Sequence, residues 1–259
     1  MFSLQNRIAL VTGAGRGIGR AIAIGLAKAG AKVGVTARTA AEVEGAVADI
    51  QKAGGQALAI VADLTQKDAP AQILQEMTAK LGPIDILVNN AGIGSSANPR
   101  PVAEFSDDFW ELSLLLNLTV PYKLSKAVLP HMREQRWGRI INIASINSKM
   151  PSLHGAAYAA SKHGLLGLTR TLALEVAREG VTVNAICPGP VRTVMNDKRI
   201  EYDALRRSMT FKEVEQAMTP IGGRLEPEDI APMAVYLAST EARMVTGQAF
   251  NICGGVLLY

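Results

Sequence analysis

The sequence alternates short, continuously apolar runs with longer stretches of helical periodicity, and this alternation limits the possible folds more than any other feature. We expect strands at residues 8–11, 31–36, 57–61, 84–89, 139–144, 181–186 and 248–252. Each run is apolar at nearly every position instead of at every second one. That pattern is typical of strands buried on both faces, as in a parallel sheet covered by helices.

The segments between these runs have the spacing of helices that cover such a sheet. We expect helices at residues 18–29, 40–52, 69–81, 156–179 and 227–238, and one or two more within 105–136. Parallel strands joined by helices form right-handed crossovers. The sequence therefore predicts an α/β fold, a single doubly wound, Rossmann-like domain over residues 1–259 with a seven-stranded parallel sheet and helices on both faces.

Composition excludes several other classes of protein. Hydrophobic residues make up 48% of the chain and charged residues 19%, as in a well-buried globular domain. The net charge of +4 is small and spread out, and no nucleic-acid-binding motif accompanies it, so we expect no nucleic-acid partner. Cys187 and Cys253 are isolated from each other and from the scattered histidines, so we expect no metal site. With no long apolar span and no secretory signal, we expect no membrane association and a cytoplasmic location.

A glycine-rich loop, Thr12-Gly13-Ala14-Gly15-Arg16-Gly17-Ile18-Gly19, follows the first expected strand and opens the first expected helix. Glycines let the backbone turn sharply and approach a pyrophosphate closely, and the helix N-terminus offers free N–H groups to it. The spacing is G-x-x-x-G-x-G, because Ile18 and Arg20 occupy the third-glycine places of the commoner G-x-G-x-x-G pattern. The loop predicts a dinucleotide site formed by Gly13, Gly15, Arg16, Gly17, Ile18 and Gly19.

The end of the second expected strand indicates which dinucleotide binds. An acidic side chain at that place would hydrogen-bond the ribose 2′-hydroxyl of NAD. Here the sequence reads Thr36-Ala37-Arg38-Thr39 and has no carboxylate. Arg38, with Arg16 from the glycine loop, is suited to a 2′-phosphate. We therefore expect NADP(H), with the alternative that both arginines are merely solvated.

Two Tyr-x-x-x-Lys pairs place a phenol and an ammonium on one helical face, Tyr122 with Lys126 and Tyr158 with Lys162. Spacing alone does not distinguish them. Ser145 comes directly after the strand expected at 139–144, and ligands of doubly wound sheets bind at the C-terminal ends of strands. No comparable serine precedes Tyr122, so the sequence favours Tyr158 and Lys162 as the functional pair.

The motifs occur in a characteristic order. The glycine loop is followed by Asn89-Asn90-Ala91-Gly92, then by Asn117, Ser145, Tyr158 with Lys162, and Pro188-Gly189. In this order the chain resembles the short-chain dehydrogenase/reductase family from residue 7 to the C-terminus. Its ending, residues 246–255, is similar to that of 3-oxoacyl-(acyl-carrier-protein) reductases and polyketide ketoreductases.

The resemblance implies roles for four catalytic residues. Tyr158 would exchange a proton with the substrate oxygen, and Ser145 would hydrogen-bond that oxygen. Lys162 would hold the nicotinamide ribose, and Asn117 would anchor a water chain that leads to Lys162. A free tyrosine has a pKa near 10, and we expect the Lys162 ammonium, joined by the positively charged nicotinamide after hydride loss, to lower that of Tyr158.

The resemblance also implies the remaining contacts of the cofactor. Cofactor contacts beyond the glycine loop are expected at Arg38, Thr39, Asp63, Leu64, Asn90, Ala91, Gly92, Tyr158, Lys162, Pro188, Gly189, Val191 and Thr193. Independently of the resemblance, the substrate pocket is expected at Gly94–Ala97, Asn147–Met150, His154 and Met195, because these residues follow strand ends or precede Tyr158. Residues 190–225, where the alternation stops, correspond to a substrate lid.

The chain is therefore interpreted as an NADPH-dependent carbonyl reductase that transfers hydride to a ketone, with a 3-oxoacyl thioester as one candidate substrate. Two alternatives stay open: a dehydrogenase of a small secondary alcohol, sugar or hydroxy acid, and a non-catalytic NADPH-binding sensor. The substrate would be a small carbonyl compound, free or on an acyl carrier or CoA. The basic residues of 190–225 either meet its phosphate or are solvated. Arg136 matches a carrier-docking position, whereas Glu179 stands where a basic residue is usual. The family resemblance also implies a homotetramer.

Overall fold

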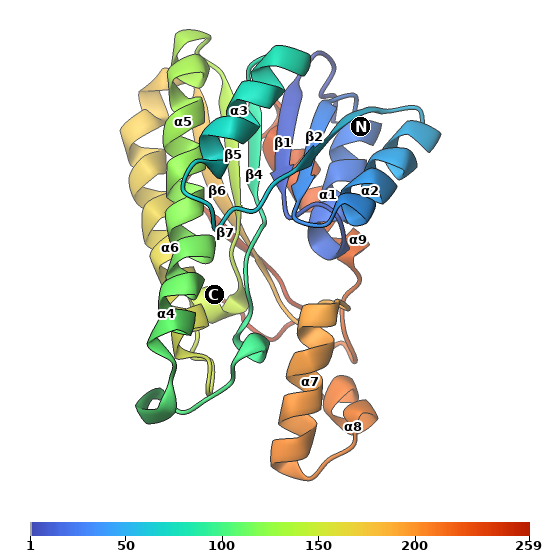
Figure 1. Ribbon diagram of the computed structural model, residues 1–259, viewed down its shortest axis with the longest axis vertical. Helices are drawn as coiled ribbons and strands as arrows, with labels where there is room; N and C mark the ends of the chain where they lie inside the picture. The colour runs from blue at the N-terminus through green and yellow to red at the C-terminus, as the bar shows by residue number, and fades with distance from the viewer. Residues whose placement is uncertain (1) are drawn as a thin grey trace.

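A central sheet lies between two layers of helices in the computed structural model, which describes residues 2–259 (Figure 1). The sheet has seven strands in the order β3-β2-β1-β4-β5-β6-β7, and every neighbouring pair is parallel. The predicted doubly wound, seven-stranded parallel sheet is confirmed. In chain order the strands are β1 Ile8–Thr12, β2 Lys32–Ala37, β3 Gln56–Val61, β4 Ile86–Asn89, β5 Gly138–Ile143, β6 Val181–Pro188 and β7 Ala249–Ile252.

The strand order reverses between β1 and β4. From β1 the chain runs outward to β2 and β3, and it then returns to place β4 on the other side of β1. The loops that follow β1 and β4 therefore leave in opposite directions and open a crevice at the C-terminal ends of the two strands. Ligands of doubly wound proteins bind in such a crevice.

Helices cover both faces of the sheet. In chain order they are α1 Gly17–Lys28, α2 Ala40–Lys52, α3 Ala69–Lys80, α4 Asp107–Leu114, α5 Val120–Glu134, α6 Ala156–Val176, α7 Val194–Arg207, α8 Phe211–Gln216 and α9 Pro227–Ala238. Short 3₁₀ turns lie at Ser95–Ala97, Val102–Glu104, Ile146–Ser148 and Ala177–Glu179.

Two hydrophobic cores result, one on each face. On one face α1, α2 and α9 pack together with Ala9 and Val11 of β1. On the other face α3, α5 and α6 pack with Leu10, the residue between them. Successive side chains of a strand point to opposite faces, so a strand with apolar residues at every position contributes to both cores. This is the reason that the continuous apolar runs predicted the strands.

One long helical segment is interrupted by a π-helical turn. The sequence indicated one or two helices within 105–136. The structure has α4 and α5 joined by the π turn Leu115–Thr119. Such turns often occur at functional sites because the extra residue redirects the neighbouring side chains. This turn contains Asn117, which is fully buried.

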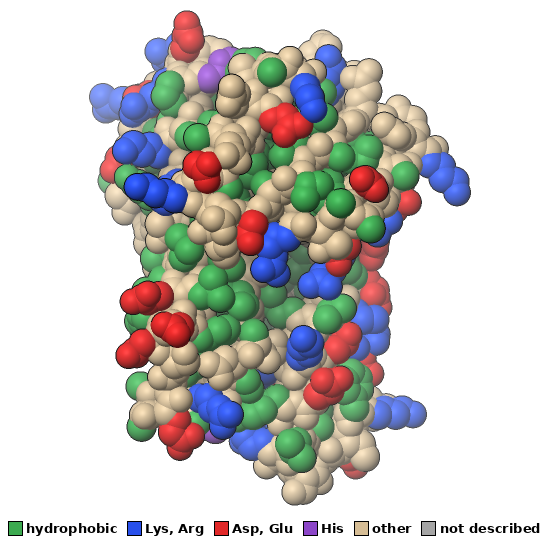
Figure 2. Space-filling view, viewed as in Figure 1, with side chains coloured by type: hydrophobic (Ala, Val, Ile, Leu, Met, Phe, Trp, Pro, Cys, Tyr) green, Lys and Arg blue, Asp and Glu red, His purple; other side chains and the backbone are tan. Residues whose placement is uncertain are grey.

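Residues 188–225 form two helices that project from the main body (Figure 1). A bridge between Val191 and Leu225 closes the base of the segment. Its helices α7 and α8 pack on a small apolar cluster of their own, Ile200, Ala204 and Val214. In the space-filling view, hydrophobic side chains are visible where this segment joins the body, between basic and acidic ones (Figure 2). Among residues 2–259, no helix combines the length and apolarity needed to cross a bilayer.

Candidate active site

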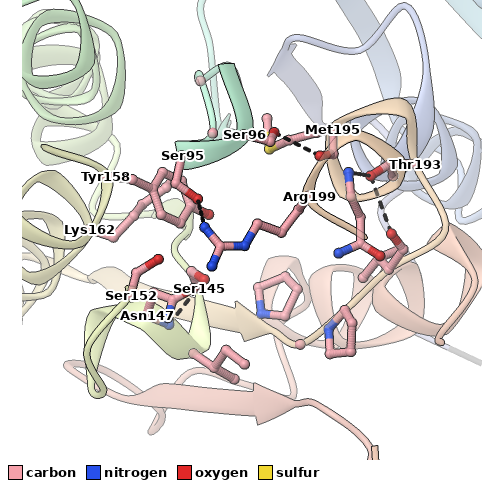
Figure 3. Close-up of a pocket in the computed structure, with 18 of the residues that line it drawn as sticks. Ser95, Ser96, Ser145, Asn147, Ser152, Tyr158, Lys162, Thr193, Met195 and Arg199 are labelled. Atoms are coloured by element: carbon pink, nitrogen blue, oxygen red, sulfur yellow. Dashed lines mark hydrogen bonds between the residues drawn. The ribbon is translucent and has the colours of Figure 1, made fainter. Parts of the chain in front are cut away.

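A cavity of about 450 Å³ opens at the C-terminal ends of the strands, between the main body and α7. Its wall comes from the loop after β4, the segment from the end of β5 to α6, the loop after β6, and α7 (Figure 3). The four residues expected to be catalytic, Asn117, Ser145, Tyr158 and Lys162, all border it. Segments far apart in the sequence thus bring two hydroxyls, an ammonium and an amide to one space.

Ser145 lies at the turn that follows β5. Its backbone is extended, and its hydroxyl caps the 3₁₀ turn Ile146–Ser148 by accepting a hydrogen bond from the Asn147 N–H at 3.1 Å. The Ser145 N–H donates in turn to the Ser148 hydroxyl at 3.2 Å. This reciprocal arrangement fixes the Ser145 side chain at the cavity wall while its hydroxyl hydrogen stays available to a ligand.

Tyr158 lies in the first turn of α6 and faces the cavity beside Ser145 (Figure 3). Removal from water raises the pKa of its phenol above the ordinary value, while the Ser145 hydroxyl acts in the opposite direction. We expected Lys162 and the charged nicotinamide together to lower this pKa, whereas the protein's own groups raise it. Loss of solvation is the largest influence on this pKa, and the Lys162 ammonium lies 5.9 Å from the ring centroid. The phenol is thus held in its protonated form, the form that a proton donor requires.

Lys162 lies one helical turn further along α6 and is 5% exposed. Its Nζ donates a hydrogen bond of 2.8 Å to the carbonyl oxygen of Ile143, the last residue of β5. Burial lowers the pKa of Lys162 to about 8. The ammonium therefore persists at neutral pH and is lost under mildly alkaline conditions.

Asn117 joins three parts of the site. Its Oδ1 accepts a hydrogen bond from the Ile93 N–H at 2.9 Å, and its Nδ2 donates to the Ile93 carbonyl oxygen at 3.0 Å. The same Nδ2 donates to the Ser161 hydroxyl at 3.0 Å. The side chain thus ties the loop after β4 to α6, next to Lys162. Its expected role in a water chain stays a prediction.

The glycine loop fits closely against the loop after β4. Gly13 has a φ of +63°, and a Cβ there would lie 2.8 Å from the Ala91 Cα. A Cβ on Gly19 would lie 2.5 Å from the Gly13 carbonyl oxygen, so neither position accepts a side chain. The Thr12 hydroxyl accepts hydrogen bonds of 3.0 Å from the N–H groups of Asn90 and Ala91. The backbone next to the N-terminus of α1 is therefore bare and rigid, which suits a pyrophosphate.

The two arginines expected to select the cofactor flank this loop. Arg16 is the N-cap of α1 and forms an ion pair of 3.5 Å with Glu42, while its side chain stays 64% exposed. Arg38 is exposed after β2, next to Thr39. Its charge contributes to lowering the pKa of Asp63, although the hydrogen bond from the Thr65 N–H is the main cause. Sequence reasoning did not include Glu42, whose charge partly offsets that of Arg16.

The loop after β6 closes the cavity on another side. Pro188, Gly189, Val191 and Thr193 all border it. Thr193 caps α7 by accepting a hydrogen bond of 3.3 Å from the Asn196 N–H. A Cβ on Gly17 would lie 3.2 Å from Thr193 Cγ2, so the start of α7 touches the glycine loop.

The remaining expected cofactor residues lie along the same crevice. Ile18, Asn90 and Gly92 border the cavity itself. Leu64 is buried after β3, beside Asp63. The residues present thus fit a dinucleotide that runs from the glycine loop toward Lys162.

Of the expected pocket residues, Gly94, Asn147, Met150 and Met195 border the cavity, whereas His154 does not. The prediction for His154 is corrected for a conformational reason. Its backbone has a φ of +56°, and the ring turns toward α7, where Nδ1 lies 2.6 Å from the Tyr202 hydroxyl.

The sequence reasoning did not assign several further residues to the wall. Arg199, Asp203 and Arg206 all border the cavity. On α7 the positions 195, 199, 203 and 206 recur at three- or four-residue spacing, which places them on one face of the helix. That periodicity was the available signal. Within the described part of the chain, no group of three or more potential metal ligands occurs.

Comparison with known proteins identifies the family. The family model described as short chain dehydrogenase matches residues 7–203. A 3-oxoacyl-(acyl-carrier-protein) reductase of Vibrio harveyi is 39% identical, over 99% of each chain. A D-beta-hydroxybutyrate dehydrogenase of Cupriavidus necator is 36% identical, over 97% of this chain and 98% of its own.

A solved structure gives the same result. A variant of the actinorhodin polyketide ketoreductase with NADPH superposes with a TM-score of 0.93 and 38% identity, over 98% of each chain. The chain belongs to the short-chain dehydrogenase/reductase family and is an oxidoreductase.

Proposed function

We propose that the protein is an NADPH-dependent reductase of ketones that belong to a 3-oxoacyl unit. The observation that carries the proposal is the meeting of Ser145, Tyr158 and Lys162 at one cavity beside a rigid glycine loop. A ketone in this cavity would have two hydroxyl donors at its oxygen and a buried ammonium behind them. A sensor that only bound the dinucleotide would not need this proton-transfer set.

The chain's residues would divide the reaction as follows. When bound, the reduced nicotinamide supplies a hydride to the carbonyl carbon. The Tyr158 phenol gives its proton to the carbonyl oxygen, and the Ser145 hydroxyl donates a hydrogen bond to the same oxygen. The Lys162 ammonium stabilises the tyrosinate that remains until a proton from solvent restores it. Hydride and proton together convert the ketone into a secondary alcohol.

The 3-oxoacyl unit is supported by what the relatives have in common. The Vibrio harveyi protein is named a reductase of 3-oxoacyl groups, and the Cupriavidus necator protein a dehydrogenase of beta-hydroxybutyrate. In both cases the reacting carbon is β to a carboxyl carbon. We propose the same relation here, and we propose residues 190–225 as the substrate lid.

NADP(H) as the cofactor is supported by the absence of a carboxylate at the end of β2, by Arg16 in the glycine loop and by Arg38 just after β2. It is supported also by the NADPH in the similar ketoreductase structure. Replacing Arg38 by leucine should lower kcat/KM with NADPH roughly 10- to 100-fold, the loss of a charge-assisted contact. Rates with NADH in the same variant serve as the control and should change little.

An acyl-carrier partner receives less support. Arg136 donates a hydrogen bond of 3.1 Å to the Arg178 carbonyl oxygen, and Glu179 pairs with Arg133. These residues precede β5 and β6, at the end of the sheet opposite the cavity. A carrier bound there would lie at the end of the sheet away from the cavity.

We propose a homotetramer and a cytoplasmic location as well. Leu174, Leu258 and Tyr259 are 82%, 89% and 77% exposed, and a subunit contact would bury this apolar surface. Two free, buried cysteines suit a reducing compartment. Light scattering coupled to size exclusion tests the assembly.

The central experiment is the initial rate of NADPH oxidation with 3-oxo compounds, set beside simple ketones and sugars. We expect clear preference for the 3-oxo compounds and slow turnover with NADH. Preference for a simple ketone or a sugar would refute the 3-oxoacyl proposal but keep the reductase mechanism. No turnover of any carbonyl compound would favour a sensor.

A further inference from the structure

The charged side chains that border the cavity are mostly basic. Among the described residues of its wall there is one acidic residue, Asp203, and the basic residues are Lys162, Arg199, Arg206 and Arg207. Lys162 belongs to the reaction centre, but the other four residues lie on α7. The α7 side of the cavity therefore carries a net positive charge that the proton-transfer chemistry does not use.

Arg199 is the most enclosed of these arginines, with 18% of its side chain exposed. Asp203 orients the guanidinium on one edge by accepting hydrogen bonds from Nε at 2.9 Å and from Nη2 at 3.3 Å. The Leu153 carbonyl oxygen accepts a further bond from Nη2 at 3.1 Å. These contacts fix the plane and direction of the group.

The other edge of the guanidinium is under-used. Within the described residues, Nη1 has only a long contact of 3.5 Å to the Ser95 hydroxyl. Figure 3 shows this end of Arg199 reaching into the cavity toward Ser95, Tyr158 and Ser145. A guanidinium has five N–H donors, so the cavity-facing nitrogen retains capacity for an acceptor supplied by a ligand.

Asp203 does not neutralise this group fully. The same carboxylate also accepts a hydrogen bond of 3.3 Å from Arg206 Nη2, so one negative charge lies between two positive ones. In a partly enclosed cavity, charge interactions are stronger than in water. An anion at Arg199 Nη1 would reduce this excess of positive charge.

We propose that Arg199, together with the Ser95 hydroxyl, forms a carboxylate-binding subsite inside the substrate cavity, and that the substrate is a short 3-oxo or 3-hydroxy acid with a free carboxylate. This inference rests on the proposed function and narrows it. A 3-oxo acid has its carboxylate only two bonds from the ketone carbon. With the ketone at Tyr158 and Ser145, the carboxylate would lie on the Arg199 side of the cavity.

A phosphate from CoA or a carrier arm matches this position less well. The pantetheine chain separates that phosphate from the ketone, whereas Arg199 lies beside the reaction centre. Arg206, further along α7 and 31% exposed, is better placed for an anion at the entrance. The location of Arg199 therefore favours a charge on the reacting molecule itself.

The experiment compares acetoacetate with methyl acetoacetate, which has the same ketone without the charge. The wild-type protein should prefer acetoacetate at least about 10-fold in kcat/KM. Arg199→Gln should lower kcat/KM for acetoacetate roughly 10- to 100-fold, mainly through KM, because a charge-assisted contact is lost. In Arg199→Gln, kcat/KM for the methyl ester should stay within about threefold of the wild-type value. Arg199→Lys should retain part of the activity on acetoacetate that Arg199→Gln loses.

Lys198→Gln is the matched control, because it removes one positive charge from the same helix at an exposed position outside the cavity wall. This variant should leave kcat/KM for both acetoacetate and methyl acetoacetate unchanged. Inhibition of the wild-type protein by butyrate and by butyramide needs no variant, and butyrate should inhibit more strongly.

Different results would refute the subsite and the proposed function. If Arg199→Gln lowered kcat/KM equally for acetoacetate and for its ester, Arg199 would only hold α7 in place, and the proposed carboxylate subsite would be refuted. A loss confined to acetoacetyl-CoA and not seen with acetoacetate would also refute it, because the anion would then be a phosphate. Failure of the wild type to reduce any 3-oxo compound would instead refute the proposed function.

Discussion

The chain contains two Tyr-x-x-x-Lys pairs with the same local geometry in different surroundings. In both, the lysine Nζ lies 5.9 Å from the centroid of the tyrosine ring. Tyr122 is 46% exposed on α5, away from the cavity. Tyr158 faces the cavity beside Ser145, and Lys162 is buried against β5.

The comparison separates what a helix provides from what the fold provides. Helical spacing places the phenol and the ammonium on one face wherever the motif occurs. Only α6 carries its pair to the C-terminal end of β5, where solvent is reduced and a serine hydroxyl is at hand. Because burial changes the pKa of both groups on α6, the same two side chains acquire different chemistry there.

Replacing Tyr158 by phenylalanine should produce the largest difference between the two pairs. The proton donor is lost while the ring is retained, so the rate of reduction should fall roughly 10²- to 10⁴-fold. A fluorescence titration should show NADPH binding close to that of wild type. Turnover near the wild-type rate would remove Tyr158 from the mechanism.

Replacing Ser145 by alanine tests whether the hydroxyl neighbour distinguishes α6 from α5. Loss of one positioned donor to the substrate oxygen should lower kcat roughly 10²-fold. Ser148→Ala is the matched control, since it disturbs the same turn without removing a hydroxyl from the cavity wall. Similar losses in the two variants would assign the effect of Ser145 to the turn alone.

The pH dependence of reduction tests the role of the buried Lys162, which the exposed lysine of α5 does not share. Its pKa is lowered to about 8, so the ammonium predominates below that pH and is lost above it. The profile of kcat/KM for reduction should be flat below pH 8 and fall as the pH rises further, up to about tenfold per unit. In Lys162→Arg the fall should move to higher pH, because a guanidinium stays charged. An unchanged profile in that variant would show that another group titrates.

Changes to the α5 pair should have the smallest effects. Tyr122→Phe and Lys126→Met should leave kcat/KM within about twofold of wild type and the free energy of unfolding within about 0.5 kcal/mol, as is usual for exposed positions. Steady-state kinetics and urea denaturation measure both quantities. A large loss of activity in either variant would contradict the division of roles between the helices.

Most of the fold could be predicted from the sequence because its signals are local. Continuous apolar runs predicted all seven strands, and the boundaries of α2 and α9 match those expected. The π turn around Asn117 was not predicted, because one extra residue in a helical turn leaves almost no trace in the periodicity. The family motifs also identified residues that the structure brings to one cavity, with Ser145 directly after β5, Asn117 in the π turn, and Tyr158 and Lys162 on α6.

The sequence by itself determined the alternating fold, the glycine loop and the residues that meet at the strand ends, because each depends on neighbours along the chain. Only the tertiary structure decided that His154 turns away toward Tyr202 and that Arg199 points into the cavity. It also decided that burial raises the pKa of Tyr158. Solvation and charge at these three residues depend on groups contributed by distant segments, and folding alone brings those groups together.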